Sequence, residues 1–416
     1  MKQRLMGALT SELQALRIEQ VGRNEQVAHS YGDAAELAAY LLPDTPVHCF
    51  SPSTLLSTLN AYLTGFPGEV SYAVKSNDGA HVLATLASGG LNTYDVASVE
   101  EMAAVRVHAP RATFHYHNPV KGRNEIALAA DRYGCVRFAA DCVQEIDKII
   151  EVASSSSQGG PAENLEIAIR FKLPKHGAAV HDFSTKFGAT VEQAQVLLRH
   201  VVARGAKPFL TFHPGSQCSD PAIWTKHIQA AAEIALGAGV RLHGLNVGGG
   251  FPSRYVGTST PPLSAYFETI AAAAAEAFGA DFMPPLECEP GRGMVASSTS
   301  VLARVKLVKH DTREIYLNDG IYGSLMEVYQ VPSIQPFCRA IASGREMEGA
   351  DVPFTIYGPT CDPLDVLPRP INLPADIAEG DFVEFGPLGA YGTATSTRFN
   401  GYGPAEVIEV ERVLAG

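Results

Sequence analysis

Short runs of β-strand character alternate with helical stretches from about residue 70 to about residue 290. Helical periodicity is clearest in stretches such as Val191–Arg204 and Ala265–Ala277. Eight predicted strands end near Tyr72–Lys75, Thr93–Val96, Phe114–His117, Val136–Ala139, Ile167–Phe171, Leu210–His213, Leu245–Gly248 and Leu286–Glu289. This alternation predicts a parallel sheet with crossover helices, and eight units fit a closed (β/α)8 barrel. The pattern alone also permits an open, doubly wound sheet.

The pattern changes after about residue 300, where helical periodicity fades and turns rich in glycine and proline become frequent. Alternating runs in this part are Ser298–Val308, Arg313–Leu317, Phe354–Tyr357, Asp381–Phe385 and Ala405–Glu411. They predict a second domain that is mainly antiparallel β-sheet. We therefore expect an N-terminal extension (1–44), a barrel (45–295) and a C-terminal β domain (296–416), to which the N-terminal segment could add a strand.

Charge and cysteine content exclude several classes of protein. The formal net charge is −12, which argues against binding to nucleic acid or to an anionic membrane. The seven cysteines form no CxxC pair, so neither a disulfide framework nor a metal site is expected. The N-terminus lacks the apolar core of a signal peptide, and no apolar run is long enough to span a bilayer. The chain is expected to be cytoplasmic.

Polar residues or glycines follow nearly every predicted barrel strand. They are Lys75, Asp95, Asn118, Arg170, His213, Gly248–Gly250 and Glu289. Any one of them is readily explained as a solvated strand end. In a closed barrel, however, the strand C-termini converge on one face, where active sites lie. Their recurrence therefore predicts a functional site at that face.

Lys75 and the three glycines have specific chemical potential. Lys75, in YAVKSN, follows an apolar strand, and partial burial would lower its pKa, as a Schiff-base nucleophile requires. The alternative is a surface lysine. In GLNVGGGFP, the backbone N–H groups of the glycines could approach a phosphate without obstruction by a Cβ. The alternative is a flexible turn, and no Walker A sequence follows.

Two further segments carry ionisable residues on tight turns. ECEPGRGM contains Glu289 and Arg292, which could form a simple salt bridge or could hold a pyridine nitrogen and a phosphate respectively. HPGSQC contains His213 and Ser216, and His213 could equally be a core histidine.

Three candidate residues lie in the predicted β domain. GPTCDPLD places Cys361 and Asp362 in a polar loop, where the thiol is a candidate for proton transfer. Most buried cysteines have only a structural role. Tyr391 lies in GAYGTATSTRFNGYG, which also reads as a β-turn.

Taken together and in order, these segments resemble the fold-type III pyridoxal 5′-phosphate (PLP) dependent decarboxylases that act on ornithine, lysine, diaminopimelate and arginine. The resemblance runs from about residue 45 to about residue 405. It implies an alanine-racemase-like TIM barrel followed by a C-terminal β domain. It also implies a head-to-tail homodimer with shared active sites, an amino acid as substrate and a place in polyamine biosynthesis.

The resemblance also implies a role for each candidate residue. Lys75 would bind PLP covalently, Asp95 would lie near that bond, and Arg170 would belong to the surrounding polar shell. His213 would stack on the cofactor ring, and Glu289 would pair with the protonated pyridine nitrogen. The phosphate would be bound by Ser216, Gly249, Gly250, Arg292 and Tyr391. From the partner subunit, Cys361 would protonate the product carbanion and Asp362 would bind the distal amine of the substrate.

One segment departs from the ornithine decarboxylase pattern, in which a second acid after NDGIYGS binds the distal amine. The segment Leu325–Pro336 reads LMEVYQVPSIQP and is one residue shorter, with Gln330–Val331 where that acid is expected. Glu327 could compensate, although its position differs. The substrate side chain would then have one charged partner instead of two.

The preferred function is decarboxylation of ornithine or lysine to a diamine. Diaminopimelate is less favoured, because the cysteine motif reads CDPLD and not CESxD. Arginine, a modified or D-amino acid, and racemisation on the same fold remain alternatives. A catalytically silent homologue would be expected to lack Lys75 or Cys361, and both are present.

Overall fold

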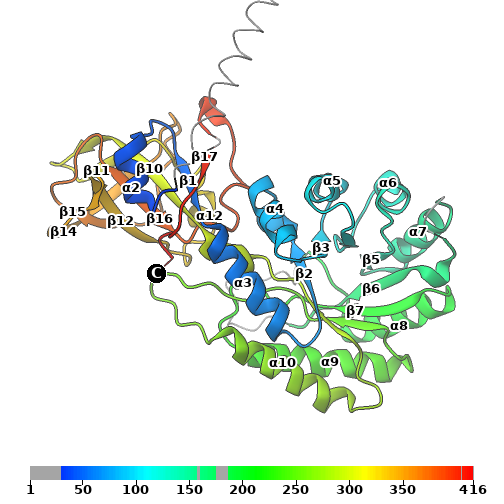
Figure 1. Ribbon diagram of the computed structural model, residues 1–416. Helices are drawn as coiled ribbons and strands as arrows, with labels where there is room; N and C mark the ends of the chain where they lie inside the picture. Colours follow the sequence, from blue (N-terminus) through cyan, green and yellow to red (C-terminus); the bar gives the residue numbers. More distant parts are fainter. Residues whose placement is uncertain (1–29, 157–159, 175–185, 404, 416) are drawn as a thin grey trace, which may run out of the picture.

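The computed structural model describes residues 30–156, 160–174, 186–403 and 405–415 (Figure 1). Eight strands form a closed barrel in which every neighbouring pair is parallel. They are β2 (Glu69–Ala73), β3 (Thr93–Val96), β4 (Thr113–Tyr116), β5 (Arg137–Ala140), β6 (Glu166–Arg170), β7 (Lys207–Thr211), β8 (Gly244–Asn246) and β9 (Leu286–Cys288). The predicted barrel is confirmed, and the open doubly wound sheet is excluded because β2 pairs with β9.

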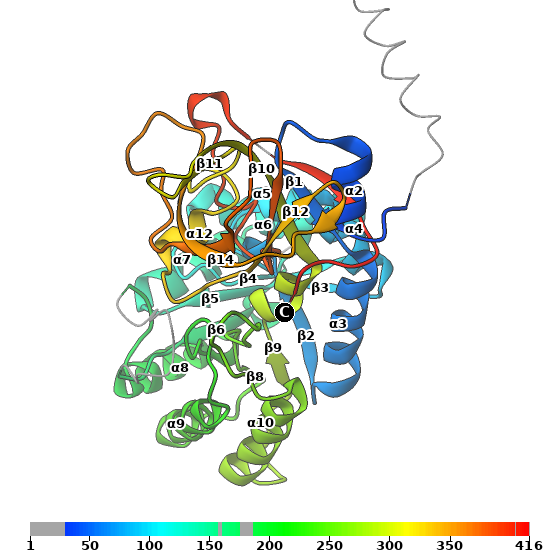
Figure 2. The same ribbon diagram turned by 90° about the vertical axis from the view of Figure 1, so that its left-hand side faces the viewer.

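Helices surround this barrel on the outside (Figures 1 and 2). They are α3 (Pro52–Gly65), α4 (Ala80–Ser88), α5 (Val99–His108), α6 (Arg123–Tyr133), α7 (Val143–Ser154), α8 (Val191–Ala203), α9 (Ala222–Ala238) and α10 (Leu263–Phe278). Local chemistry explains where α8 begins. The hydroxyl of Thr190 accepts a hydrogen bond from the Gln193 N–H, and the Gln193 side chain accepts one from the Thr190 N–H. This capping box satisfies two N–H groups that a helix end otherwise leaves unpaired.

The second sheet has nine strands and lies beside the barrel. Seven of them follow the order β13-β12-β16-β10-β11-β14-β15. They are β10 (Thr299–Lys309), β11 (Glu314–Leu317), β12 (Phe337–Ala342), β13 (Arg345–Glu346), β14 (Asp351–Tyr357), β15 (Ile371–Pro374) and β16 (Phe382–Gly386). The sheet is mainly antiparallel, as predicted, although β11 pairs with β14 in parallel. The short helices α11 (Arg292–Val295) and α12 (Met326–Gln330) lie on either side of β10 and β11 in the chain.

The other two strands of this sheet come from opposite ends of the chain. β1 (Val47–Phe50) pairs antiparallel with β10 and parallel with β17 (Glu406–Glu409). The chain therefore contributes a strand to the second sheet before it enters the barrel, after the helix α2 (Ala34–Leu41). The domain boundaries at residues 44 and 295 stay predictions, but β1 lies inside the range predicted for the barrel and pairs outside it.

The two largest apolar cores among the described residues support the two parts. The larger one fills the barrel and the space under its helices, and a separate cluster lies within the second sheet. Backbone hydrogen bonds connect the parts near the end of β2, where the Tyr391 N–H donates to the Ser76 carbonyl at 2.8 Å. Among the described residues, no helix combines the length and the apolar character needed to cross a membrane.

Candidate active site

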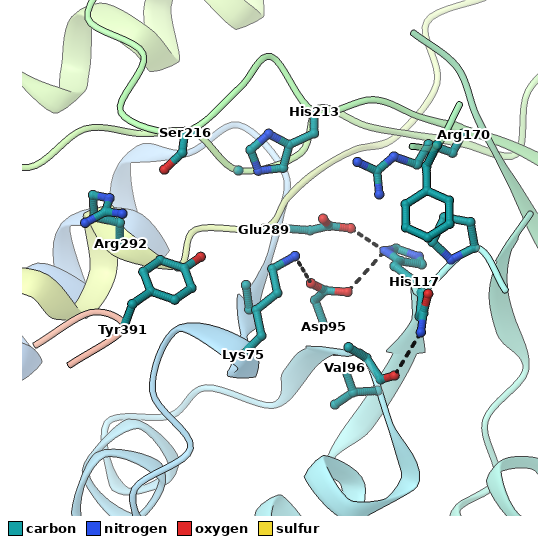
Figure 3. Close-up of a pocket in the computed structure, with 18 of the residues that line it drawn as sticks. Lys75, Asp95, Val96, His117, Arg170, His213, Ser216, Glu289, Arg292 and Tyr391 are labelled. Carbon is teal, nitrogen blue, oxygen red and sulfur yellow. Dashed lines mark hydrogen bonds and ion pairs between the residues drawn. The ribbon is translucent and has the colours of Figure 1, made fainter. Parts of the chain in front are cut away.

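A cavity of about 520 Å³ opens at the carboxyl ends of the barrel strands (Figure 3). Its lining brings together ten of the predicted site residues, and their roles remain predictions. These ten are Lys75, Asp95, Arg170, His213, Ser216, Gly249, Gly250, Glu289, Arg292 and Tyr391. They are distributed over 317 positions, from 75 to 391, so barrel closure and the approach of the second sheet both contribute to the site.

Lys75 lies in a 3-10 turn (Val74–Ser76) directly after β2 and points toward Asp95 (Figure 3). Its Nζ is 3.9 Å from Asp95 Oδ2, and 46% of its side chain is accessible, through the cavity. Burial in the barrel mouth lowers the pKa of Lys75, but Asp95, Tyr391 and Glu289 outweigh that effect and raise it above its usual value. The prediction of a lowered pKa is therefore wrong for the chain alone, because a strand end next to other strand ends also gathers carboxylates.

Asp95 and Glu289 are both buried at the cavity floor, and their pKa values are shifted in opposite directions. Burial and the nearby Glu289 raise the pKa of Asp95 to about 7. Burial also disfavours the charged form of Glu289, but His117, Lys75 and His213 outweigh it and lower the pKa of Glu289 to about 2. Glu289 is thus the carboxylate that stays ionised at neutral pH.

His213 is uncharged in this environment. Burial, Lys75 and Arg170 lower its pKa to about 3. The Gly215 N–H donates to Nδ1 of His213 at 3.1 Å, which leaves the proton of the neutral ring on Nε2. A flat, neutral ring at the cavity wall is suited to stacking on another aromatic ring.

The turn after β8 offers backbone donors that only glycine can present. Gly248 and Gly250 have φ angles of +70° and +93°. A Cβ on Gly249 would lie 2.6 Å from the Glu289 carbonyl oxygen, and one on Gly250 would lie 2.3 Å from the Gly215 carbonyl oxygen. Among the described residues, the N–H groups of Gly249 and Gly250 have no protein acceptor. They remain available to an anion in the cavity.

Arg292 is buried and held by two partners on other segments. Its Nη1 donates to Glu327 Oε2 at 2.8 Å and to the Tyr255 hydroxyl at 2.9 Å, and its Nη2 donates to Glu327 Oε1. Burial disfavours the charged guanidinium, but Tyr255 and Glu327 raise the pKa of Arg292 overall. The buried Nε has no partner among the described residues. The pair therefore fixes the guanidinium and leaves its Nε–H for a ligand.

Three of these contacts were not foreseen from the sequence. His117 lines the cavity and donates from Nδ1 to Glu289 Oε1. Its signal was present in HYHNP, where His115 and His117 alternate on one face of a predicted strand. Tyr255 and Glu327 meet Arg292 only through the tertiary fold. Glu327 was considered above as a substitute acid for the substrate, but both of its oxygens are bonded to Arg292. Gln330 and Val331, which stand where the second acid was expected, line the cavity.

Cys361 and Asp362 do not line the cavity of their own chain. The Cys361 side chain is exposed, with Sγ 3.3 Å from Asn400 Oδ1. Asp362 accepts a hydrogen bond of 2.5 Å from the Tyr322 hydroxyl, which lowers the pKa of its carboxyl. The expected contribution of these residues from a partner subunit stays a prediction.

The cavity fits a phosphorylated pyridine aldehyde in three respects. It has an amine at its floor, a buried ionised carboxylate, and a set of backbone and guanidinium N–H groups without acceptors. Buried polar atoms normally have partners, so unpartnered ones at a cavity surface indicate a ligand. Among the described residues, His117 Nε2 and Arg292 Nε are such atoms, and both residues line the cavity.

Comparison with known proteins agrees with this reading. Residues 53–296 match the pyridoxal binding domain of pyridoxal-dependent decarboxylases. The chain is 30% identical to ornithine decarboxylase of Panagrellus redivivus, covering 86% of this chain and 84% of that protein. It is also 30% identical to lysine/ornithine decarboxylase of Selenomonas ruminantium, covering 82% of this chain and 83% of that protein.

Solved structures show the same overall arrangement. Lysine/ornithine decarboxylase of Vibrio vulnificus, complexed with putrescine, has a TM-score of 0.76 and 26% identity, over 90% of this chain and 96% of that one. The same protein complexed with cadaverine has a TM-score of 0.77 over equal shares. These matches confirm the predicted family, cofactor and reaction class.

Proposed function

Because this chain belongs to the pyridoxal-dependent decarboxylase family, we propose that it removes the α-carboxylate of ornithine or lysine to give the corresponding diamine. The observation that carries the proposal is the convergence of the Lys75 amine, the Glu289 carboxylate and the glycine N–H groups on one cavity. PLP, when bound, supplies an acceptor for the electrons that remain at Cα after CO₂ has left. Binding, orientation and proton transfer are assigned to the residues of the protein.

We assign the binding of PLP to three groups of residues. Lys75 presents its amine for covalent attachment, close to Asp95. Glu289 presents an anionic oxygen that favours a protonated ring nitrogen, and the neutral His213 ring and Arg170 complete the surroundings. The phosphate is assigned to Ser216, Gly249, Gly250, Arg292 and Tyr391.

The phosphate assignment follows from the donors that are left over. Within the part of the chain that the structure describes, the N–H groups of Gly249 and Gly250 have no acceptor, and the Nε–H of Arg292 stays unpaired after the pairing with Glu327. Because Glu327 balances the charge of Arg292, these residues would hold the phosphate mostly by directed hydrogen bonds. Such a site discriminates by shape and donor placement more than by net charge.

We further propose a homodimer in which Cys361 and Asp362 of the partner subunit complete each site. Support comes from their position outside the cavity of their own chain, in the loop between β14 and β15, where Cys361 is exposed. Cys361 would return a proton to Cα, and Asp362 would bind the distal amine of the substrate. A cytoplasmic location and a role in making polyamine precursors fit this activity.

The distal amine of the substrate would have one predicted acid as partner here, and not two. Gln330 stands where the second acid was expected, and both oxygens of Glu327 are occupied by Arg292. Amino acids with a longer or modified side chain are therefore included among the substrates to be tested.

Covalent trapping tests the cofactor assignment. We expect the protein incubated with PLP to show visible absorbance and, after borohydride reduction, a pyridoxyl adduct on the peptide that contains Lys75. Lys75→Ala should lose the adduct and the absorbance. Lys309→Ala is a suitable control, because the Lys309 side chain is 45% exposed and lies outside the cavity. An adduct elsewhere, or none, would contradict the assignment.

Product analysis tests the substrate class. CO₂ release and diamine formation are measured with the L and D forms of ornithine, lysine and arginine, and with diaminopimelate. We expect ornithine or lysine to give the highest kcat/KM. Turnover of none of the basic amino acids by a PLP-loaded protein would refute the substrate while leaving the cofactor assignment intact.

A further inference from the structure

Two buried histidine–glutamate pairs lie one above the other inside the barrel. His115 on β4 bonds through Nδ1 to Glu287 Oε1, and His117, just after β4, bonds through Nδ1 to Glu289 Oε1. The two imidazole rings are stacked, with centroids 5.6 Å apart and planes at 29°. Alternate residues of a strand face the same side, so this spacing places both pairs in the barrel interior.

The lower pair is complete without a ligand. Arg137 donates through Nη1 to Glu287 Oε2 and through Nε to Glu166 Oε2 at 2.7 Å. Neither His115 nor Glu287 lines the active-site cavity. The groups of this layer pair with one another, and we assign the layer a structural role.

The upper pair has one side left open. Oε1 of Glu289 accepts hydrogen bonds from His117 Nδ1 and from Asn246 Nδ2, the latter at 2.5 Å. Among the described residues, Oε2 of Glu289 has no hydrogen-bond partner, and His117 Nε2 is buried without one. One carboxylate oxygen is thus fixed by two donors, whereas the other is left for what occupies the cavity (Figure 3).

We propose that His117 is a positioning residue that fixes Glu289 through its Nδ1–H, so that Oε2 is directed to the ring nitrogen of PLP. The inference rests on the proposed function and names the residue that prepares Glu289 for it. A carboxylate held by two donors loses its rotational freedom before the cofactor arrives, which lowers the entropic cost of pairing with the ring nitrogen.

The electrostatics of the cavity floor agree with this role. Burial alone would raise the pKa of Glu289, and His117 is the strongest of the groups that lower it. Burial also lowers the pKa of His117, but the charge of Glu289 and the hydrogen bond to it raise the pKa overall. His117 therefore keeps Glu289 ionised where an isolated buried carboxyl would take up a proton.

Matched substitutions in the two layers separate positioning from packing. His117→Leu removes the donor to Glu289, and His115→Leu removes the equivalent donor to Glu287 one layer away. His117→Asn keeps an N–H donor at the same number of bonds from Cα as Nδ1. If His117→Leu does not fold, His117→Ala is used in its place. It removes the same donor and leaves space that water can fill.

Two readouts independent of turnover are used on each PLP-loaded protein. The protonation of the cofactor is followed by nitrogen NMR of PLP labelled at its ring nitrogen. The dissociation constant of PLP is measured by absorbance titration of the apoprotein. For His117→Leu we expect a shift of the ring-nitrogen signal toward the unprotonated form and a dissociation constant raised about tenfold, the size of one lost charge-assisted hydrogen bond.

Wild-type values are expected for His115→Leu and, within about twofold, for His117→Asn. The proposal is overturned if His117→Leu keeps a fully protonated ring nitrogen, if His115→Leu changes it equally, or if His117→Asn behaves like His117→Leu. A wild-type chain that takes up no PLP refutes the proposed function itself. A wild-type chain that binds PLP with an unprotonated ring nitrogen refutes only this inference.

Discussion

At the scale of single residues, the pair formed by Arg292 and Glu327 shows how a buried charge is made tolerable. Both side chains are almost fully buried, and Glu327 bonds both terminal nitrogens of the guanidinium. An unpaired charge at this depth would be strongly disfavoured. Glu327 therefore acts on the predicted phosphate site indirectly, through Arg292.

Glu327→Ala should lower the free energy of unfolding of the apoprotein by about 3 kcal/mol, because it leaves Arg292 buried without its counter-charge. Equilibrium urea denaturation measures the change. Glu314→Ala, which removes the carboxylate partner of the half-exposed Lys309, is the control and should change the free energy of unfolding only slightly. Adding Arg292→Leu to Glu327→Ala should restore part of the loss, and full stability of Glu327→Ala alone would show that the pair is unimportant.

At the scale of secondary-structure elements, the turns that follow the strands decide which groups the barrel presents to the cavity. β8 ends at Asn246, and the following glycines bring the backbone against the Gly215 and Glu289 carbonyl oxygens. Asn246 accepts from the Gly248 N–H and donates to Glu289, so one side chain ties the turn to the carboxylate. The turn and the acid are thus built as one unit.

Gly250→Ala should weaken PLP binding at least about tenfold and destabilise the apoprotein by about 2 kcal/mol. The added Cβ would lie 2.3 Å from the Gly215 carbonyl oxygen at a φ of +93°. Gly257→Ala is matched, because Gly257 has a φ of +72° and no atom within 4 Å of the added Cβ. It should cost only about 1 kcal/mol and leave PLP affinity unchanged. Equal effects of the two substitutions, by titration and denaturation, would remove the steric argument.

At the scale of the whole molecule, the second sheet completes the cavity but also exposes Cys361. Tyr391 reaches the cavity from the segment that follows β16, whereas Cys361 and Asp362 lie away from the cavity. If partner subunits exchange these loops, each site uses Lys75 from one chain and Cys361 from the other. Two inactive variants can then complement one another.

Mixing equal amounts of Lys75→Ala and Cys361→Ala subunits, after reversible dissociation, should recover about a quarter of wild-type activity. Half of the dimers would be mixed, and each mixed dimer would have one intact site. Decarboxylation by the mixture is compared with that of each variant alone. No recovery between subunits shown to have exchanged would place both residues in the same site of one chain.

Acid should destabilise the apoprotein through histidines that are buried without charge. Burial lowers the pKa of His48, whose Nε2 lies 2.7 Å from Ser324 Oγ, to about 4. Between pH 4 and 6.5 the unfolded chain binds the extra proton, so the free energy of unfolding rises with pH, by about 3 kcal/mol for this residue. Asp95 acts in the opposite sense, since its raised pKa makes the folded chain the better proton binder up to about pH 7.

The contribution of His48 can be isolated with His48→Gln, which has an amide to face Ser324 but does not titrate. Denaturation midpoints are measured from pH 4.5 to pH 7.5 for both proteins. The variant should lose less stability than the wild type on acidification. Parallel curves would show that His48 is already accessible to protons in the folded chain.

The sequence by itself determined the features that depend on local chemistry. The alternation of strand runs with helical stretches specified the eight barrel units, and turns rich in glycine and proline marked the change to β-sheet after about residue 300. Since parallel strands in a closed barrel end on one face, the residues after those strands could be assigned to one cavity before any contact was known. Lys75, Asp95, Glu289 and the glycines were found in this way.

The tertiary structure alone decided which of these groups meet and with what charge. His117 and Glu289 are 172 positions apart, and Arg292 and Glu327 are 35 apart, so no local pattern links them. The raised pKa of Lys75 and the pairing of β1 with β10 also depend on closure and register. Hydrogen bonds and Coulomb interactions act over a few ångströms in space, whereas sequence periodicity reports only neighbours along the chain.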